Sequence, residues 1–150
     1  MTDKIPFGGP SITQKEIDYV TDAVTNGWYG NWSCYLDKFE EAFSLYLGVK
    51  NSIATSSCTG ALHIAMKALD IRSGDEVIVP ESTWIASASC VSYVGAEPVF
   101  ADIESDTWCI DPNDIVRKIT SKTKAIIPVH MYGHPADMIK IRAIADQYGL

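Results

Sequence analysis

Short apolar runs alternate with segments of helical periodicity from residue 52 to the end of the chain. Four runs have the length and composition of strands: residues 52–56 (SIATS), 76–79, 97–101 and 124–129. The segments between and after them have helical spacing: residues 59–69, 83–94, 112–119 and 136–148. Most of the strand-like runs are continuously apolar, which is typical of parallel strands buried on both faces. We therefore expect an α/β fold with three layers, in which helices cover a mostly parallel sheet.

Two helices are predicted before the first strand-like run. Thr13 is a candidate N-cap with Glu16 at the capping-box position, and Gly27 ends this first helix. The second helix ends at Gly48. Its apolar residues recur at helical spacing: Leu36, Phe39, Phe43 and Leu47. We interpret residues 1–150 as a single domain with 1–50 as a helical lead-in.

Composition excludes several kinds of partner. The net charge is -7, and the 12 lysines and arginines form no cluster, which argues against a nucleic-acid or anionic-membrane surface. No apolar stretch approaches the length of a membrane span, and the N-terminus lacks the apolar core of a signal peptide. The four cysteines are widely spaced, as expected for reduced thiols in a cytoplasmic protein.

The stretch SCTG, which joins the run 52–56 to the helix 59–69, is a candidate anion site. Ligands of parallel sheets collect where strands end and helices begin, because the first amides of a helix have no partner inside it. Thr59 adds a hydroxyl, and Gly60 lets a ligand approach the backbone. The alternative is structural: Ser57 or Thr59 only caps the helix, and Gly60 only eases packing.

Trp84 follows the next strand-like run, at the start of a helix rich in small residues. It is either a core side chain or a flat surface for a ring-shaped ligand. Phosphate-binding amides at one strand end and an aromatic ring at its neighbour together suit a phosphorylated aromatic cofactor.

Histidines suggest no metal centre. His130 and His134 are four residues apart, but Gly133 and Pro135 are incompatible with a helix there, and no third ligand is evident. His63 lies inside the helix 59–69 and is expected to be packed or partly exposed.

Taken together, these motifs resemble the DegT/DnrJ/EryC1/StrS family of pyridoxal-phosphate-dependent aminotransferases, which act on nucleotide-linked keto sugars. The resemblance runs from about residue 5 to Leu150 and is most similar to the perosamine-synthase-like branch. It rests on several stretches in order: GWYGNWSCYLDKFEEAF, SSCTGALHIAMKAL, GDEVIVPESTWIASAS, FADIESDTWCIDP and IIPVHMYGHPADM. It implies the N-terminal half of the large domain of a fold-type I aminotransferase.

The resemblance also implies roles for particular residues. Cys58, Thr59 and Gly60 would bind the cofactor phosphate, with Cys58 in place of the usual glycine. Trp84 would stack on the pyridine ring, and His130 would border the cofactor pocket. The family's sugar-nucleotide site would be bordered by two residues of the loop after the first helix: Trp28 and Tyr29.

The family's two catalytic groups have no counterpart in the sequence. These are an aspartate against the pyridine nitrogen and a lysine that forms the Schiff base, and both are expected beyond Leu150. We therefore interpret the chain as a truncated cofactor-binding domain, with no catalytic residue of its own and no transaminase activity alone.

Three functions are compatible with the sequence. The first is part of an aminotransferase that moves an amino group from glutamate to a nucleotide-linked 4-keto-6-deoxy sugar for surface polysaccharide or O-antigen synthesis. The second is a sugar dehydratase of the same family, with histidine at the Schiff-base position. The third is a non-catalytic α/β ligand-binding module. The resemblance also implies a homodimer, because the family's active site lies between two subunits.

Overall fold

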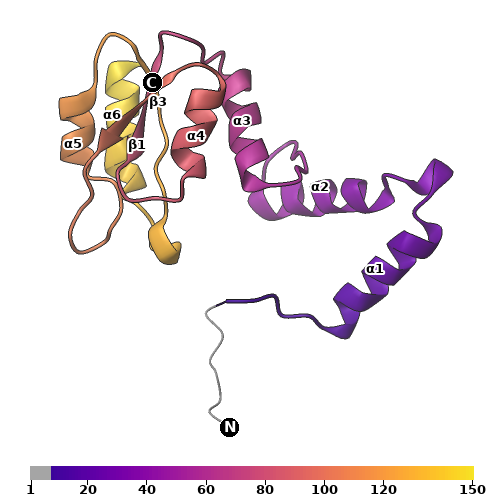
Figure 1. Cartoon of the computed structure of the whole chain (residues 1–150). Helices are drawn as coiled ribbons and strands as arrows, with labels where there is room; N and C mark the ends of the chain where they lie inside the picture. Colours follow the sequence, from indigo (N-terminus) through magenta and orange to yellow (C-terminus); the bar gives the residue numbers. More distant parts are fainter. Residues whose placement is uncertain (1–7) are drawn as a thin grey trace. The chain divides into compact units, whose positions relative to one another are not determined.

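The computed structural model describes residues 8–150, so the first seven residues of the lead-in lie outside the described part (Figure 1). The chain divides into two units, one up to Ala54 and the other Thr55–Leu150. Each is described by itself below.

The first unit contains two helices joined by a short 3-10 turn: α1 (Gln14–Asn26), η1 (Tyr29–Asn31) and α2 (Cys34–Leu47). The predicted caps are confirmed. The Glu16 carboxylate accepts hydrogen bonds from the backbone N–H of Thr13, at 2.7 Å, and from its hydroxyl. Gly27 is the C-cap of α1, and Gly48 ends α2 with a left-handed backbone, φ 66°.

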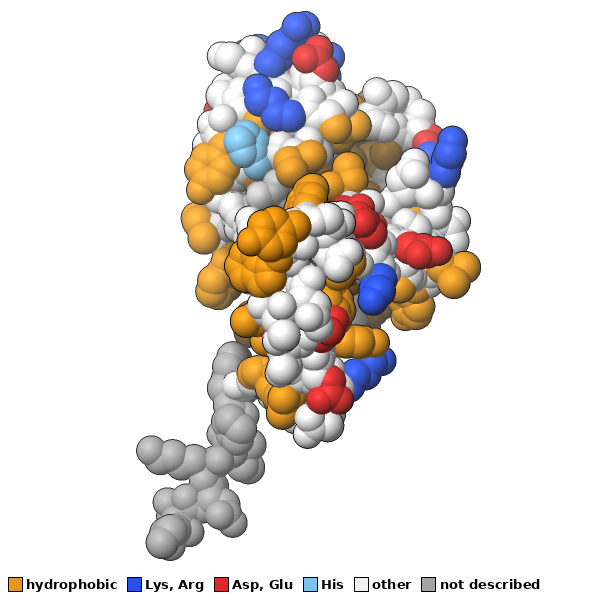
Figure 2. All heavy atoms as spheres, turned by 90° about the vertical axis from the view of Figure 1, so that its right-hand side faces the viewer, with side chains coloured by type: hydrophobic (Ala, Val, Ile, Leu, Met, Phe, Trp, Pro, Cys, Tyr) orange, Lys and Arg blue, Asp and Glu red, His pale blue; other side chains and the backbone are white. Residues whose placement is uncertain are grey.

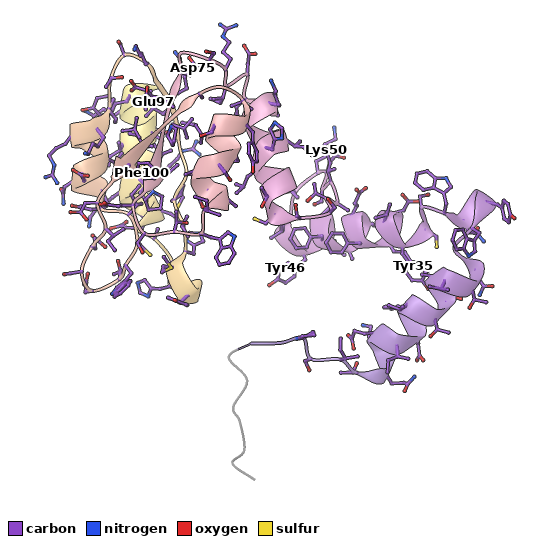
Figure 3. The ribbon with its side chains drawn as sticks, in the orientation of Figure 1. Tyr35, Tyr46, Lys50, Asp75, Glu97 and Phe100 are labelled. Carbon is purple, nitrogen blue, oxygen red and sulfur yellow. The ribbon has the colours of Figure 1, made fainter. Side chains whose placement is uncertain are left out.

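Polar contacts join the parts of the first unit. Tyr35 on α2, which is labelled in Figure 3, donates a hydrogen bond from its hydroxyl to the carboxylate of Asp22 on α1. No side chain of α1 or α2 is buried, and hydrophobic side chains lie at the surface over these helices (Figure 2). The exposed apolar residues fall at helical spacing on each helix: Ile17, Val20 and Val24 on α1, and Leu36, Phe39, Phe43 and Leu47 on α2.

The second unit alternates helices and strands, as the sequence predicts. Its helices are α3 (Cys58–Ala68), α4 (Ala86–Tyr93), α5 (Pro112–Lys118) and α6 (Met138–Tyr148), with a 3-10 turn η2 (Met131–Gly133). Its strands are β1 (Glu76–Pro80), β2 (Glu97–Ala101) and β3 (Thr123–Ile126). They form one sheet in the order β2-β1-β3, and both pairings are parallel.

Two apolar clusters make the three layers that the sequence predicts. Side chains alternate across a strand, so Val77 and Val79 of β1 face one cluster and Ile78 faces the other. The first cluster packs β1 against α3 and α4 through residues such as Met66 and Val91. The second packs the opposite face against α5 and α6, for example through Ile115. Burial on both faces accounts for the continuous apolar run of β1.

The predicted strand 52–56 is wrong. These residues form no strand, and Ile53 is 74% exposed. A strand needs a neighbour to pair with its backbone, and none of the three strands in the described part pairs with this segment. Instead the N–H of Ala54 donates to the Glu40 carboxylate of α2, at 2.7 Å. The parallel sheet therefore has three of the four expected strands.

Between residues 8 and 150 there is no helix with the length and apolar character needed to span a bilayer.

Candidate cofactor site

The three parallel strands end at one edge of the sheet. The segments that follow β1, β2 and β3 therefore leave from the same side, beginning at residues 81, 102 and 127. Helix α3 connects through residues 69–75 to the start of β1, so its N-terminus points back toward the edge where β1 ends (Figure 1). The structure thus places Thr59 and Trp84 at the same edge, as predicted.

The N-terminus of α3 offers free hydrogen-bond donors. The hydroxyl oxygen of Ser57, the N-cap, accepts the backbone N–H of Gly60 at 3.1 Å, and its carbonyl accepts the N–H of Ala61 at 3.0 Å. No acceptor among the described residues contacts the N–H groups of Cys58 and Thr59. Ser57 therefore supplies the cap, and two helical amides stay available for an anion.

Cys58 fits the position where the family usually has glycine. It is the first residue of α3, and the non-glycine residues with positive φ in the described chain do not include it: Tyr29, Asp70, Trp108 and Tyr132. The backbone here is helical, so a side chain at this position brings no conformational strain. The Cys58 thiol is exposed, and all four cysteines are free.

Trp84 is not a core residue. Its side chain is 80% exposed, in the loop between β1 and α4. The hydroxyls of Thr83 and Ser87 lie 2.9 Å apart and tie this loop to the first turn of α4. An exposed indole on an anchored loop at the ligand-bearing edge is available to stack on a flat ring.

His130 follows β3 at the same edge and is exposed. Its Nδ1 accepts the backbone N–H of Ala136 at 3.0 Å, which leaves Nε2 as the donor of a neutral ring. His63 packs edge-on against Tyr93 of α4, with ring centroids 5.7 Å apart. The described residues contain no group of three or more potential metal-ligating side chains.

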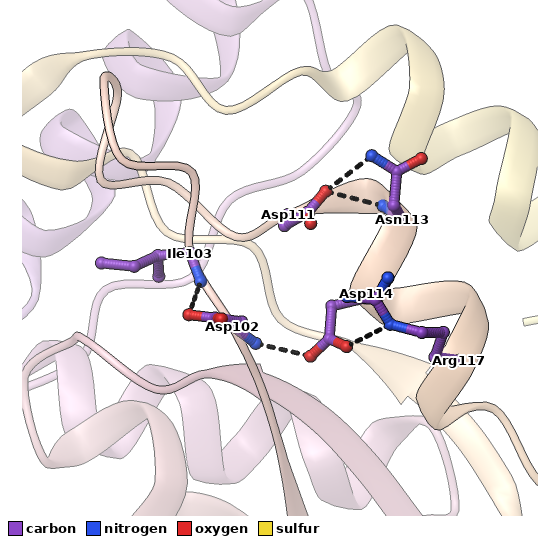
Figure 4. A network of polar contacts seen from close by, with 6 residues as sticks. All are labelled: Asp102, Ile103, Asp111, Asn113, Asp114 and Arg117. Carbon is purple, nitrogen blue, oxygen red and sulfur yellow. Dashed lines mark hydrogen bonds and ion pairs between the residues drawn. The ribbon is translucent and has the colours of Figure 1, made fainter.

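The loop after β2 is held by a polar network (Figure 4). Asp114 of α5, whose side chain is 9% exposed, accepts the backbone N–H of Asp102 at 2.7 Å and binds Nε of Arg117 at 2.8 Å. The Asp102 amide, and then the Arg117 guanidinium, hold the pKa of the Asp114 carboxyl below its usual value. Asp111 caps α5 by accepting the N–H of Asn113 at 2.8 Å. These contacts fix where the loop begins and ends.

A hollow that the sequence did not indicate lies beside this loop. Its volume is about 370 Å³, and its lining residues come from the loops after β2 and β3: Asp106, Thr107, Trp108, Met131, Tyr132 and His134. Trp108 and Tyr132 stand 24 positions apart in the sequence, and they line one hollow because the loops after β2 and β3 meet, where the Cys109 thiol lies 3.4 Å from the carbonyl of His134.

Trp28 and Tyr29 belong to the first unit. The indole N–H of Trp28 donates to the carbonyl of Val24 at 2.6 Å, and Tyr29 has a left-handed backbone, φ 54°. Both rings are exposed at the turn between α1 and α2. Their sugar-nucleotide role stays a prediction.

Comparison with known proteins identifies the family to which the chain belongs. The model of the DegT/DnrJ/EryC1/StrS aminotransferase family matches residues 10–150, so the chain belongs to this family. It is 44% identical to a GDP-perosamine synthase of Escherichia coli O157:H7 over 146 residues, which is 97% of this chain and 40% of the relative. The GDP-perosamine synthase of Vibrio cholerae is 42% identical, with the same coverage. The chain thus spans about 40% of the length of the curated relatives it matches.

Solved structures share the fold. An aminotransferase from Psychrobacter cryohalolentis superposes with a TM-score of 0.89 at 42% identity, over 97% of this chain and 37% of that one. The NtdA protein of Bacillus subtilis, solved with bound cofactor PMP, superposes with a TM-score of 0.82 at 36% identity, over 100% of this chain and 37% of that one. The expected three-layer α/β fold of a pyridoxal-phosphate-dependent aminotransferase is thereby confirmed for this chain.

Proposed function

We propose that the chain is the cofactor-phosphate and ring-stacking part of a pyridoxal-phosphate-dependent sugar-nucleotide aminotransferase. The amino donor is glutamate, and the acceptor is a nucleotide-linked 4-keto-6-deoxy sugar used for surface polysaccharide. Family membership and the names of the relatives support the reaction class. The observation that carries the proposal is the pair of unpartnered amides, at Cys58 and Thr59, on the same sheet edge as the exposed Trp84.

The residues present fit the cofactor. Two free amides, a hydroxyl and the positive end of the α3 dipole suit a phosphate, which carries negative charge and accepts several hydrogen bonds. Trp84 offers an aromatic face of the kind that a pyridine ring stacks on.

Each residue has a distinct role in this proposal. Cys58 and Thr59 hold the phosphate and so fix the position of the cofactor, and Trp84 covers one face of its ring. His130 presents Nε2–H at the same edge of the sheet, because Nδ1 already accepts the backbone N–H of Ala136. Bound pyridoxal phosphate supplies the aldehyde that carries the amino group and a ring that withdraws electrons.

Amino transfer also needs a lysine to bind the cofactor covalently and an aspartate against the ring nitrogen. None of the lysines in this chain stands in the matching family context. We therefore expect these 150 residues to bind the cofactor without transferring an amino group.

We further propose that residues 1–150 belong to one cofactor-binding domain of a cytoplasmic homodimer. Support comes from the exposed apolar stripes on α1 and α2, which have the pattern of helix faces that pack against a partner. Trp28 and Tyr29, at the turn between these helices, would border the sugar-nucleotide site.

A titration tests the proposal. The purified chain is titrated with pyridoxal 5′-phosphate and, separately, with pyridoxal, which lacks the phosphate. We expect pyridoxal phosphate to bind at least about tenfold more tightly, because charged hydrogen bonds are worth about 1.5–3 kcal/mol each. Equal affinities would overturn the phosphate site. Glutamate-dependent amination of a keto sugar nucleotide by the chain alone would show that a lysine within it is catalytic.

A further inference from the structure

An asparagine–glycine pair, Asn26 and Gly27, stands at the end of α1. In such a pair the backbone nitrogen of the second residue can attack the side-chain carboxamide of the first. Glycine favours this attack, because it has no side chain to hinder the approach and its backbone is free to adopt the required conformation. The other asparagines of the chain precede bulkier residues: Asn31, Asn51 and Asn113. Asn26 therefore has the sequence context that most favours deamidation.

The surroundings of Asn26 admit water, which deamidation consumes. Its side chain is exposed, and no side chain of α1 is buried. The last turn of α1 also has no basic residue to stabilise the negative end of the helix dipole. Helix ends without buried side chains open locally at a low cost in free energy. We therefore expect the last turn of α1 to open often.

Both reacting groups are occupied while this turn is closed. The N–H of Gly27 donates to the carbonyl of Ala23 at 2.9 Å, and Nδ2 of Asn26 donates to the carboxylate of Asp22 at 2.7 Å. The attacking nitrogen must give up its proton and the carboxamide must turn toward it, so both hydrogen bonds have to break. The folded helix thus slows the reaction, and opening of its last turn permits it.

Asp22 joins this turn to α2. One of its carboxylate oxygens accepts the Asn26 amide, and the other accepts the hydroxyl of Tyr35. The Tyr35 hydroxyl, and then the Asn26 amide, hold the pKa of the Asp22 carboxyl below its usual value. Asp22 is therefore charged at neutral pH, and deamidation would remove one of the two donors that stabilise its charge.

We propose that Asn26 is a site of spontaneous deamidation whose product loosens the last turn of α1. The Gly27 nitrogen gives its proton to solvent and forms a bond to Cγ of Asn26. The bond from Cγ to the amide nitrogen then breaks, and ammonia leaves. Water opens the resulting cyclic imide at either carbonyl to give aspartate or isoaspartate. Water is consumed and ammonia is released in equal amounts, and nothing is oxidised or reduced.

Either product is unfavourable in the folded helix. An aspartate at this position stands one helical turn from Asp22, where like charges repel, and it adds negative charge to the negative end of the helix dipole. An isoaspartate also lengthens the backbone by a methylene group, which disrupts the hydrogen bonds of the helix. Because water and ammonia exchange with solvent, the reaction does not reverse. The altered fraction therefore increases with the age of the molecule.

Mass spectrometry of the 150-residue chain during incubation in mildly alkaline buffer tests the site. We expect faster deamidation at Asn26 than at Asn31, which precedes a tryptophan. Asp22→Ala should accelerate the reaction at Asn26 by about three- to tenfold, because it removes a hydrogen bond that opposes the reaction. Asp18→Ala is the matched control, since Asp18 binds the Gln14 amide at 2.7 Å, farther from Asn26 on the same helix. Equal rates at Asn26 and Asn31, or equal rates in the two variants, would overturn the inference.

Hydrogen exchange tests the consequence for α1. Asn26→Asp reproduces the aspartate product, so the N–H of Gly27 should exchange about threefold faster or more, as expected when a hydrogen bond that holds the last turn is lost. Asn31→Asp adds the same charge in η1 and should leave this exchange unchanged. Unchanged exchange in Asn26→Asp, or an equal increase in both variants, would contradict the loosening of α1.

Discussion

Asp114 holds the backbone of Asp102 in place: its carboxylate accepts the Asp102 N–H at 2.7 Å across twelve residues of chain. This contact joins the end of β2 to α5 and so closes the loop that carries Trp108. Arg117 binds the other carboxylate oxygen (Figure 4). A buried carboxylate that accepts hydrogen bonds from two donors holds both donors, and the segments that carry them, in place.

Replacement of Asp114 by alanine should therefore destabilise the chain. The backbone N–H of Asp102 would lose its acceptor, and a hydrogen bond to a charged group contributes about 1.5–3 kcal/mol. Urea unfolding of wild type and Asp114→Ala measures the difference. Asp146→Ala is the matched control, because Asp146 binds Arg142 at the surface and should contribute less than about 1 kcal/mol. Equal losses in the two variants would contradict the structural role of Asp114.

Gly27 is required at the end of α1 for a steric reason. A Cβ at this position would lie 2.5 Å from the carbonyl oxygen of Ala23, which accepts the Gly27 N–H at 2.9 Å. Gly27→Ala should therefore lower the free energy of unfolding by about 1–3 kcal/mol, as overpacking does elsewhere. In a melting curve followed by circular dichroism, the helical signal should be lost at a lower temperature. Gly30→Ala is the control, because a Cβ added at Gly30 would have no other heavy atom within 4 Å. A melting curve for Gly27→Ala that matches the control would refute the steric argument.

The Tyr35 phenol should lose its proton at an unusually high pH. Its hydrogen bond to Asp22 raises the pKa of the phenol to about 12. Because the folded pKa lies above the ordinary value of about 10, the contact stabilises the fold fully below that pH. This stabilisation is lost as the pH rises through about 12. The phenolate absorbance of wild type minus that of Tyr35→Phe isolates this group, and Asp22→Asn should return its pKa toward the ordinary value. A Tyr35 titration unaffected by Asp22→Asn would exclude the contact.

The exposed stripes of α1 and α2 predict association of the chain. We expect a dimer or a larger species in sedimentation at micromolar concentration, because contiguous apolar helix faces are normally covered by other parts of a protein or by a partner. Replacement of Phe39 and Phe43 by glutamate should shift the chain toward monomer, whereas Ser92→Glu on α4 should not. A compact wild-type monomer with a sharp thermal transition would instead favour a stand-alone module.

Local chemistry made much of the fold predictable from the sequence. The caps at Thr13, Gly27 and Gly48 depend on neighbouring residues alone, and each is observed. The apolar run that became β1 is buried between helix layers, so its composition matches its environment, whereas β2 and β3 are only partly buried. The run 52–56 has a similar composition but pairs with no strand. Composition alone does not reveal whether a partner strand is present.

The site was predictable only in part, for a related reason. The free amides of α3 follow from the strand–helix order, and the resemblance to the family added Trp84. The hollow at Trp108 and Tyr132 depends on left-handed backbone at two aromatic residues. Sequence patterns predict such a conformation for glycine or asparagine, not for tryptophan or tyrosine.

The central claim is that Thr59 and Trp84 bind one cofactor, and the affinity of the chain for pyridoxal 5′-phosphate tests it most directly. Thr59→Val removes the hydroxyl, and Trp84→Ala removes the exposed ring. We predict that each weakens binding by about tenfold, since a hydrogen bond to a charged group or a stacked ring contributes about 1–3 kcal/mol. Thr21→Val on α1, whose side chain is exposed and makes no hydrogen bond within residues 8–150, should leave the affinity unchanged. Wild-type affinity in both Thr59→Val and Trp84→Ala would contradict the account.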